Sequence, residues 1–253
     1  MAEQAQPLVS VIMPAYNAAA YVEAAIRSVI GQTITDWELI VIDDRSADES
    51  YNVIQRLAAE DERIRAFRNP QNMGVARTRN FGIEQACGQF IAFLDSDDIW
   101  HADKLEKQLA LAKETGAGIV YCSYAIMNAQ GGKAKEDYIV PAKTDFEHLL
   151  RENVILCSAM MVRAEILKKI PFNTEFFHED FVLALDIMKA GYAAVGYTEV
   201  LMKWRYIDNS RSFDKRKAAQ NRWKVYRDYL KLPFAQSAII FLQYALAGLK
   251  KYR

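Results

Sequence analysis

Three carboxylates, those of Asp95, Asp97 and Asp98, follow directly on the apolar run 90–94. Five consecutive apolar residues are typical of a strand buried on both faces in a parallel sheet, and open α/β sheets bind ligands at the carboxyl ends of such strands. Carboxylates this close repel one another unless a cation neutralises them. The spacing therefore predicts Mg²⁺ or Mn²⁺, held by few protein ligands together with a substrate phosphate. The alternative is a solvated acidic turn that caps a helix beginning near Ala102.

The elements that would position these carboxylates alternate between strand and helix along the N-terminal half. Such alternation is typical of an α/β protein with a mostly parallel sheet and right-handed crossovers. The second strand also ends in acidic residues, Asp43 and Asp44, so we expect a shared ligand site at this edge of the sheet. The pattern predicts strands at 8–13, 39–42, 64–67 and 90–94, helices at 18–30, about 48–61 and around 80–86, and an end to the first strand at Pro14.

Length, composition and cysteine usage indicate an intracellular globular protein. The chain has 253 residues, 51% of them hydrophobic, enough for one large α/β domain or a domain with an appended element. Its three cysteines are widely spaced and form no C-x-x-C pair, which argues against a disulfide framework or a zinc site and fits a reducing cytosol. The N-terminus lacks the basic and apolar stretches of a signal peptide. We therefore expect a cytoplasmic location.

Charge is distributed unevenly, although 32 Lys/Arg and 32 Asp/Glu balance overall. Residues 203–253 contain 13 basic and 3 acidic residues, a balance of +10, which leaves −10 for residues 1–202. Such asymmetry indicates an anionic surface as partner. No nucleic-acid-binding motif accompanies the charge, so we expect no nucleic acid and instead a peripheral contact with a membrane.

The C-terminal segment 213–253 is predicted to be a basic amphipathic helical extension. Its first part, 214–229, carries aromatic residues among many Lys and Arg, and its second, 232–249, is strongly apolar. The second part approaches the length of a membrane span, but proline and glutamine residues interrupt it, which favours an interfacial helix. The same pattern fits a helix packed on the protein's own core or on a second subunit, so a homodimer is the open alternative.

The turn after the first strand, residues 14–18, contains no glycine. Dinucleotide-binding proteins need glycines there to let the backbone approach the pyrophosphate, which argues against a nicotinamide enzyme. The chain also lacks the G-x-x-x-x-G-K-[ST] signature, so a P-loop is excluded. A nucleotide can still bind if its base and ribose meet side chains and its diphosphate meets a metal. Tyr16 offers a ring face and Asp44 an acceptor for a base N–H.

Five segments of the chain carry a recognisable combination of motifs: 11–17, 37–46, 72–82, 93–98 with Trp100, and 178–180. In combination, these segments resemble the inverting family 2 glycosyltransferases, which have the GT-A fold, and most closely the bacterial enzymes that build teichuronic acid, capsule or lipopolysaccharide chains. The resemblance covers about residues 8–212 and departs from the usual pattern at Thr78, where alanine is common.

The resemblance implies a GT-A domain over 1–212 with two halves. A nucleotide-sugar-binding half would span about 8–130 and an acceptor-binding half about 145–212. Between them, Gly131-Gly132 and the mixed polar run to Thr144 form the clearest predicted loop.

The resemblance also implies a donor and a set of residues that bind it. The donor would be a nucleotide-sugar, most simply a UDP-sugar. Pro14, Tyr16 and Asp44 would contact its nucleoside, with Asp44 on the uracil N–H. Arg79 would hold the base or the diphosphate, and Asp95 would lie on the ribose side.

The reaction implied by the resemblance is an inverting transfer. Asp97, with Asp95, would bind the Mn²⁺ or Mg²⁺ that grips the diphosphate. Asp180 would remove the proton from a hydroxyl of a glycan or lipid-linked glycan acceptor, and a positioned base of this kind contributes ~10²–10⁴-fold. The acceptor would be met at the inner face of the cytoplasmic membrane.

Several of these residues have structural alternatives. Tyr16 could cover the sheet edge, and Arg79 could be an ion-pair partner for the acidic clusters. Asp98 is expected to cap a helix or to support its neighbours. Of the remaining residues, Glu179 could orient the base or contact the acceptor, His178 is expected to make a local hydrogen bond, and Trp100 could pack under the loop or line the acceptor site.

Three other classes compete with this hypothesis. A sugar-1-phosphate nucleotidyltransferase usually has a glycine-rich loop after the first strand, which this chain lacks. A phosphatase of the haloacid dehalogenase type has threonine or valine two residues after its second aspartate, whereas Ile99 occupies that position here. A non-catalytic nucleotide- or carbohydrate-binding protein would need no base, so Asp180 argues against it.

Overall fold

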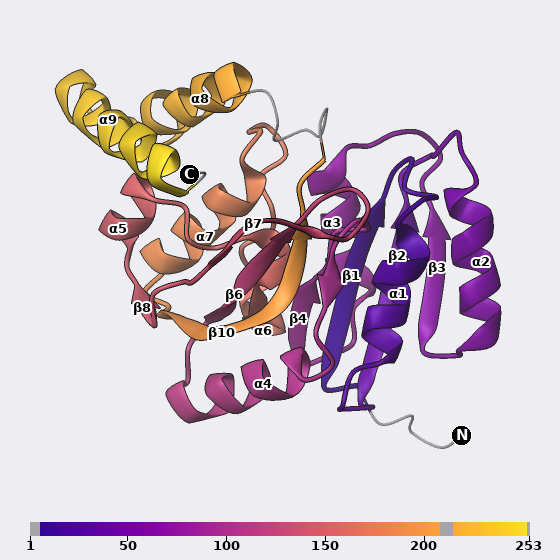
Figure 1. Ribbon diagram of the computed structural model, residues 1–253. Coiled ribbons are helices and arrows are strands. Elements are labelled where there is room, and N and C mark those ends of the chain that lie inside the picture. The colour runs from indigo at the N-terminus through magenta and orange to yellow at the C-terminus, as the bar shows by residue number, and fades with distance from the viewer. Residues whose placement is uncertain (1–5, 208–214, 252–253) are drawn as a thin grey trace.

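The computed structural model describes residues 6–207 and 215–251 (Figure 1). Within these residues one sheet has the strand order β3-β2-β1-β4-β9-β6-β10-β5, with β7 added to β6 and β8 to β10. The strands are β1 Val9–Ala15, β2 Trp37–Asp43, β3 Ile64–Arg68, β4 Phe90–Phe93, β5 Ile99–Trp100, β6 Ile119–Met127, β7 Lys133–Tyr138, β8 Lys143–Thr144, β9 Met161–Arg163 and β10 Ala194–Arg205.

Six strands, β1, β2, β3, β4, β6 and β10, run in one direction. The pairs β1–β2, β1–β4, β2–β3 and β6–β10 are parallel. The short strand β9 lies between β4 and β6 and is antiparallel to both. The strands on its two sides therefore run in the same direction. The predicted mostly parallel α/β sheet is therefore confirmed.

Helices cover both faces of the sheet (Figure 1). Alternate residues of β1 enter two separate cores: Val11 and Met13 pack with α1, α2 and α4, and Ile12 packs with α3, α5, α6 and α7. This double burial is the reason why the strands are apolar throughout. The helices are α1 Val22–Ile30, α2 Ser50–Glu60, α3 Val75–Gln85, α4 Lys104–Thr115, α5 Phe146–Arg151, α6 Ala164–Leu167, α7 Glu179–Lys189, α8 Lys215–Lys224 and α9 Phe234–Lys251, with a 3₁₀ turn at Cys157–Ala159 and a π-helical turn at Val225–Tyr229.

The first strand does not end at Pro14, as the sequence predicted, but continues to Ala15. Pro14 lies opposite Ile42 of β2, whereas the ladder to β4 has already ended at the pair Ile12–Phe93. The missing N–H of the proline therefore removes no bond to β4. The helix that follows begins at Val22 rather than Ala18.

The polar run 131–144 is not the predicted loop. Its residues form β7, which pairs antiparallel with β6, and β8, which pairs antiparallel with β10. Gly131, with φ of 88°, makes the tight turn that precedes β7. The run is polar because most side chains of β7 are exposed, so its composition resembles that of a loop.

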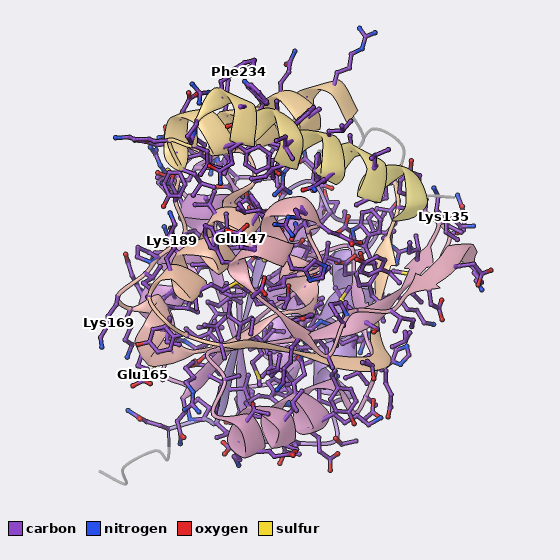
Figure 2. All side chains as sticks on the ribbon, turned by 90° about the vertical axis from the view of Figure 1, so that its left-hand side faces the viewer. Lys135, Glu147, Glu165, Lys169, Lys189 and Phe234 are labelled. Carbon is purple, nitrogen blue, oxygen red and sulfur yellow. The ribbon has the colours of Figure 1, made fainter. Side chains whose placement is uncertain are left out.

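The helices predicted near 214–229 and 232–249 are confirmed as α8, the π-helical turn and α9. Of these elements α9 packs on α5, α8 and the π-helical turn pack against α9, and Figure 2 shows Phe234 pointing outward from this layer. Val225, Tyr226 and Ile240 are buried in the core on the α7 side of the sheet. No helix among the described residues is both long and apolar enough to cross a membrane.

Candidate active site

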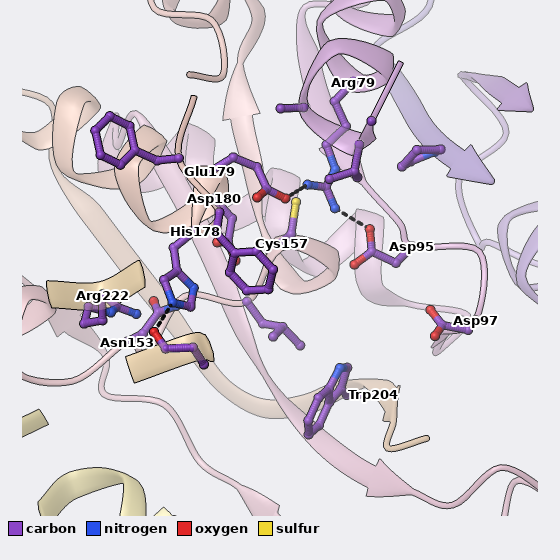
Figure 3. A pocket seen from close by; sticks show the side chains of 18 of the residues that line it. Arg79, Asp95, Asp97, Asn153, Cys157, His178, Glu179, Asp180, Trp204 and Arg222 are labelled. Carbon is purple, nitrogen blue, oxygen red and sulfur yellow. Dashed lines mark hydrogen bonds and ion pairs between the residues drawn. The ribbon is translucent and has the colours of Figure 1, made fainter. Parts of the chain in front are cut away.

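A cavity of about 1230 Å³ lies at the carboxyl edge of β1, β2 and β4 and reaches α8 and α9 (Figure 3). The edge residues come from strands that lie side by side, so their C-terminal turns meet. The cavity brings together every predicted site residue, because Pro14, Tyr16, Asp44, Arg79, Asp95, Asp97 and Asp180 all line it.

Asp95 and Asp97 form the acidic end of this cavity. Burial, and then the neighbouring charge of Asp95, raise the pKa of the Asp97 carboxyl to about 6. Its backbone carbonyl accepts a hydrogen bond from Arg205 Nε at 2.7 Å, which fixes the turn. The positive charge of Arg205 lowers the pKa of Asp97 but does not outweigh burial and Asp95, so the ionised form of this carboxylate is only partly compensated.

Asp98 lies behind the acidic pair and takes no part in the cavity wall. Only 1% of it is exposed, and its Oδ1 accepts a hydrogen bond from the Arg205 N–H at 2.8 Å. It does not cap α4, whose N-cap residue is Asp103. The alternative of a solvated acidic turn is therefore wrong for Asp98, which instead ties the end of β10 to the turn.

Arg79 bridges the two sides of the cavity (Figure 3). Its Nη2 contacts Asp95 Oδ1 at 2.5 Å and its Nη1 contacts Glu179 Oε1 at 2.8 Å. Burial alone would lower the pKa of this guanidinium, but the neighbouring acidic groups Cys157, Asp95 and Glu179 together outweigh burial and hold the pKa well above its ordinary value. Arg79 is thus an ion-pair partner of the acidic cluster, as the structural alternative predicted, and it also lines the cavity.

Asp44 organises the loop between β3 and α3. Its Oδ1 accepts hydrogen bonds from Asn69 Nδ2 and the Met73 N–H, both at 2.7 Å, and its Oδ2 accepts one from the Gly74 N–H at 2.9 Å. A carboxylate has about four lone-pair positions. One therefore remains on Oδ2 for a donor in the cavity.

The turn after β1 presents Tyr16 to the cavity. The backbone N–H of Asn17 donates to Ser46 Oγ at 2.9 Å, and Asn17 Oδ1 accepts from the Ala47 N–H at 2.9 Å. These bonds join the turn after β1 to the turn after β2. Tyr16 is 53% exposed, so its ring does not serve as a buried cover for the sheet edge. Pro14, two residues earlier, is buried.

Asp180 lies in the first turn of α7, where the helix dipole favours a carboxylate. Its Oδ1 accepts a hydrogen bond from the Phe181 N–H at 2.8 Å. The preceding His178 contacts the Ala218 carbonyl through Nε2 at 2.9 Å. A carbonyl can only accept, so Nε2 donates this bond and links the start of α7 to α8.

Cys157 and Ser158 lie at the site although no sequence pattern predicted them there. Cys157 lies between Arg79 and Asp180 in Figure 3, and burial, reinforced by nearby carboxylates, raises the pKa of its thiol well above the ordinary value. It is therefore a neutral thiol rather than a nucleophile. Ser158 Oγ accepts a hydrogen bond from the Asp95 N–H at 3.0 Å, and its carbonyl accepts one from Trp100 Nε1 at 2.9 Å, so Trp100 packs under the turn.

Arg222 is a further cavity residue that the sequence analysis did not single out. It was one of many basic residues in the C-terminal segment. A signal was present in its spacing, since Ala218, Val225 and Tyr226 lie four, three and four residues away and share one face of a helix.

Comparison with known proteins decides the family. The model described as glycosyl transferase family 2 matches residues 10–171, and the Bacillus subtilis protein named as the teichuronic acid biosynthesis glycosyltransferase TuaG is 37% identical over 97% of this chain and 98% of its own length. The chain belongs to glycosyl transferase family 2. It is also 36% identical to an Escherichia coli family member, the glucosyltransferase WfgD, over 97% of this chain and 95% of that protein. It is thus a glycosyltransferase, as the sequence predicted.

Solved structures of glycosyltransferases share the fold. Residues 1–349 of Staphylococcus aureus TarS, in complex with UDP-GlcNAc, match with a TM-score of 0.73 and 18% identity over 94% of this chain and 71% of that one. A mannosyltransferase from Pyrobaculum calidifontis, in complex with GDP-Man and Mn²⁺, gives 0.74 and 18% over 96% and 70%. These similarities confirm the predicted GT-A fold class.

Proposed function

We propose that this glycosyltransferase moves a sugar from a UDP-sugar to a hydroxyl of a glycan or lipid-linked glycan, with inversion and with the help of a divalent cation, during synthesis of a bacterial surface polysaccharide. The observation that carries the proposal is the meeting, in one cavity, of the acidic pair at the end of β4 and of Asp180 on α7. The names of TuaG, for teichuronic acid, and of WfgD, for a UDP-Glc donor and a diphosphoundecaprenol-linked acceptor, support the choice of pathway and substrates.

The donor is proposed to lie along the edge of β1, β2 and β4. The Tyr16 ring offers a stacking face to the base, and Pro14 shapes the floor of the cavity. Asp44 keeps one lone pair for the uracil N–H, because its other acceptor positions hold the loop 69–74. Arg79 is proposed to face the diphosphate while its own position is fixed by two carboxylates.

Asp97 and Asp95 fit a divalent cation. No group of three or more His, Cys, Asp or Glu among the described residues could hold a metal by itself. Two carboxylates suit an ion that takes its remaining ligands from a substrate diphosphate and water. The raised pKa of Asp97 marks a charge that such a cation would compensate. A bound Mg²⁺ or Mn²⁺ would offset the negative charge that develops on the leaving diphosphate.

Asp180 is proposed to act as the general base. Its carboxylate takes the proton of the acceptor hydroxyl as that oxygen forms a bond to the anomeric carbon. The bond from this carbon to the β-phosphate oxygen breaks, and its electron pair leaves with UDP on the opposite face. Arg79 holds Glu179, the neighbour of Asp180, and thereby fixes the turn that carries the base.

We propose that the enzyme lies at the cytoplasmic face of a membrane and contacts it through α9. The outward face of α9 carries Ile239, Leu242 and Leu246, which are 53–61% exposed, and their spacing places them on one side of the helix. The surrounding C-terminal segment carries the +10 balance, and each basic residue near an anionic leaflet adds ~1 kcal/mol to binding. A homodimer that buries the same stripe is the rival arrangement.

Ligand-induced stabilisation tests the proposed donor and cation. We expect UDP with Mn²⁺ to raise the thermal unfolding temperature of the protein, whereas NAD and inorganic phosphate, with or without Mn²⁺, do not. A ligand present at 100 times its Kd stabilises a protein by ~2.7 kcal/mol, which a thermal scan resolves. Equal stabilisation by NAD, or by UDP in EDTA, would contradict the proposal. A screen of UDP-sugars for slow hydrolysis by the purified protein then identifies the sugar.

A further inference from the structure

Arg222 stands out among the buried basic residues of the cavity. Only 2% of it is exposed, yet its Nε and Nη1 have no hydrogen-bond partner among residues 6–207 and 215–251. The guanidinium lies between two aromatic rings, 3.4 Å from the centroid of Phe181 on α7 and 4.8 Å from that of Tyr244 on α9. Two nitrogen atoms of this charged group, which carry three N–H donors, are therefore buried without an acceptor from the described part of the chain.

The two other buried arginines of the site show what this position lacks. Arg79 pairs with two carboxylates. Arg205 donates to the carbonyl oxygens of Asp97, Asn128 and Ala129. A buried charge is costly unless it is paired and hydrogen-bonded, and stacking on aromatic rings compensates only part of that cost. Nε and Nη1 of Arg222 are thus available to a hydrogen-bond acceptor that none of the described residues supplies.

A group that accepts hydrogen bonds from Arg222 would lie on the far side of Asp180, the proposed base, from the acidic pair. In Figure 3 Asp97 and Arg222 lie on opposite sides of the cavity, with Asp180 between them. The wall beside Arg222 is built from small residues of α8 and α9, among them Ala218, Ala245 and Gly248, which leave room for a ligand. A donor held at Asp97 would leave this end of the cavity to the acceptor.

We propose that Arg222 binds an anionic group of the acceptor, beyond the hydroxyl that Asp180 deprotonates. The proposal rests on the proposed function. The planar fork of guanidinium donors matches a phosphate or a carboxylate in a bidentate fashion. A phosphate is favoured because α9 lines the cavity with Tyr244 and exposes the apolar stripe Ile239, Leu242 and Leu246 on its other side. A lipid attached to that phosphate could leave the cavity along α9.

Binding of soluble probes, with the donor site filled by saturating UDP and Mn²⁺, tests this. We expect farnesyl diphosphate to bind and farnesol to bind much more weakly in isothermal titration calorimetry. Arg222→Met keeps an apolar contact with the two rings but removes the charge and the N–H donors. It should weaken binding of farnesyl diphosphate about tenfold or more, because a hydrogen bond to a charged group is lost. Arg222→Lys should retain part of the affinity. Lys224→Met changes the same charge at an exposed position of the same helix and should have no effect.

A second pair of probes, octyl glucuronide and octyl glucoside, distinguishes a carboxylate from a phosphate as the bound group. Dependence on Arg222 for the glucuronide alone would assign the anion to a uronic acid. The proposal is overturned if both charged probes bind the Met variant as tightly as wild type, if Met binds as well as Lys, or if neither charged probe binds better than its neutral partner.

Failure of the proposed function has a separate signature in this experiment. UDP with Mn²⁺ should bind wild type and all three variants with the same affinity, because Arg222 lies away from the donor residues. Loss of UDP binding in every protein would count against the donor assignment, whereas the comparison of Met with Lys at position 222 would still decide the anion site.

Discussion

The donor wall and the helical wall of the cavity are built on different principles. At the edge of β1, β2 and β4 the polar groups are tied to one another: Asp44 accepts three N–H groups and Arg79 pairs with two carboxylates. On α8 and α9 the wall consists of small residues and aromatic rings around Arg222, whose guanidinium is incompletely bonded. The strand ends therefore form a half of the cavity in which polar groups are fixed by one another, whereas the helices form a half in which, among the described residues, the buried cation keeps unpaired donors.

The largest effect is expected from a substitution of Asp180, the proposed base, which lies between the two walls. Asp180→Asn changes the size of the side chain little but removes the base, so transfer should fall by at least about 100-fold. Binding of UDP with Mn²⁺ should be unchanged, because the donor wall is intact. The measurements are single-turnover transfer from a UDP-sugar and calorimetric titration of UDP. If the variant keeps more than about a tenth of wild-type turnover, the base lies elsewhere.

At the donor wall, Asp97→Asn should lower the metal-dependent affinity for UDP about tenfold or more, because one of two carboxylate ligands is lost. Asp103→Asn, six residues along the chain, removes a carboxylate that pairs with Lys107 and serves as the matched control. Titration calorimetry with UDP in the presence and absence of Mn²⁺ measures the effect. Unchanged binding in Asp97→Asn would remove Asp97 from the cation site.

The raised pKa of Asp97 adds a dependence on pH. Cation binding needs the ionised carboxylate, so affinity for UDP with Mn²⁺ should be constant above pH 7 and fall as the pH drops through about 6. Without ligand the sign is opposite: the folded protein binds this proton more tightly than the unfolded chain, so ionised Asp97 costs stability above pH 6 and nothing below about pH 4. At pH 7 the unliganded Asp97→Asn variant should therefore unfold at a higher denaturant concentration than wild type.

The helical wall should unfold together with the sheet if it is an integral part of the molecule. Tyr226 is fully buried, and its hydroxyl donates to the Leu150 carbonyl at 2.6 Å. Tyr226→Phe leaves that carbonyl without its partner, so the free energy of unfolding should fall by about 1–2 kcal/mol. Urea denaturation followed by circular dichroism measures it, with Tyr192→Phe as control. A separate early transition that alone responds to Tyr226→Phe would show that α8 and α9 form an independent unit.

The smallest effect is expected at the outer surface of α9. Replacing Ile239, Leu242 and Leu246 together by Gln should reduce flotation with anionic vesicles about threefold to tenfold, because burial of such a side chain is worth at most ~1.5–3 kcal/mol and only part of each enters the headgroup region. Ile139→Gln removes an equally exposed side chain elsewhere and should have no effect. A concentration-dependent dimer that the triple change abolishes, without vesicle binding, would favour the subunit interface.

Much of the donor wall could be predicted from the sequence because strand ends are encoded locally. The apolar run 90–94 and the acidic residues that follow it lie next to each other in the chain, and the parallel pairing of β1, β2 and β4 brought Asp44 and Asp95 to one edge. The predictions for this wall were wrong only in two element boundaries, the end of β1 at Pro14 and the start of α1.

The rest of the site could not be predicted because its contacts join distant parts of the chain. Arg79 and Glu179 are separated by 100 residues and His178 and Ala218 by 40, so no local pattern predicts either pair. Cys157 enters the cavity through a single 3₁₀ turn that has no recognisable motif. The run 133–138 was misassigned because an edge strand with exposed faces has the composition of a loop.

The ion pairs of Arg79 have a consequence for how the enzyme could be redesigned. The planar guanidinium of Arg79 contacts Asp95 at 2.5 Å and Glu179 at 2.8 Å. Its covalent geometry therefore sets the distance between the turn that carries Asp95 and the turn that carries Asp180. Altered specificity should therefore be sought in the cavity walls around 153–156 and 174–177. Substitutions there can change the shape of the cavity around the donor sugar or the acceptor sugar, while Arg79 keeps Asp95 and Asp180 at a constant separation.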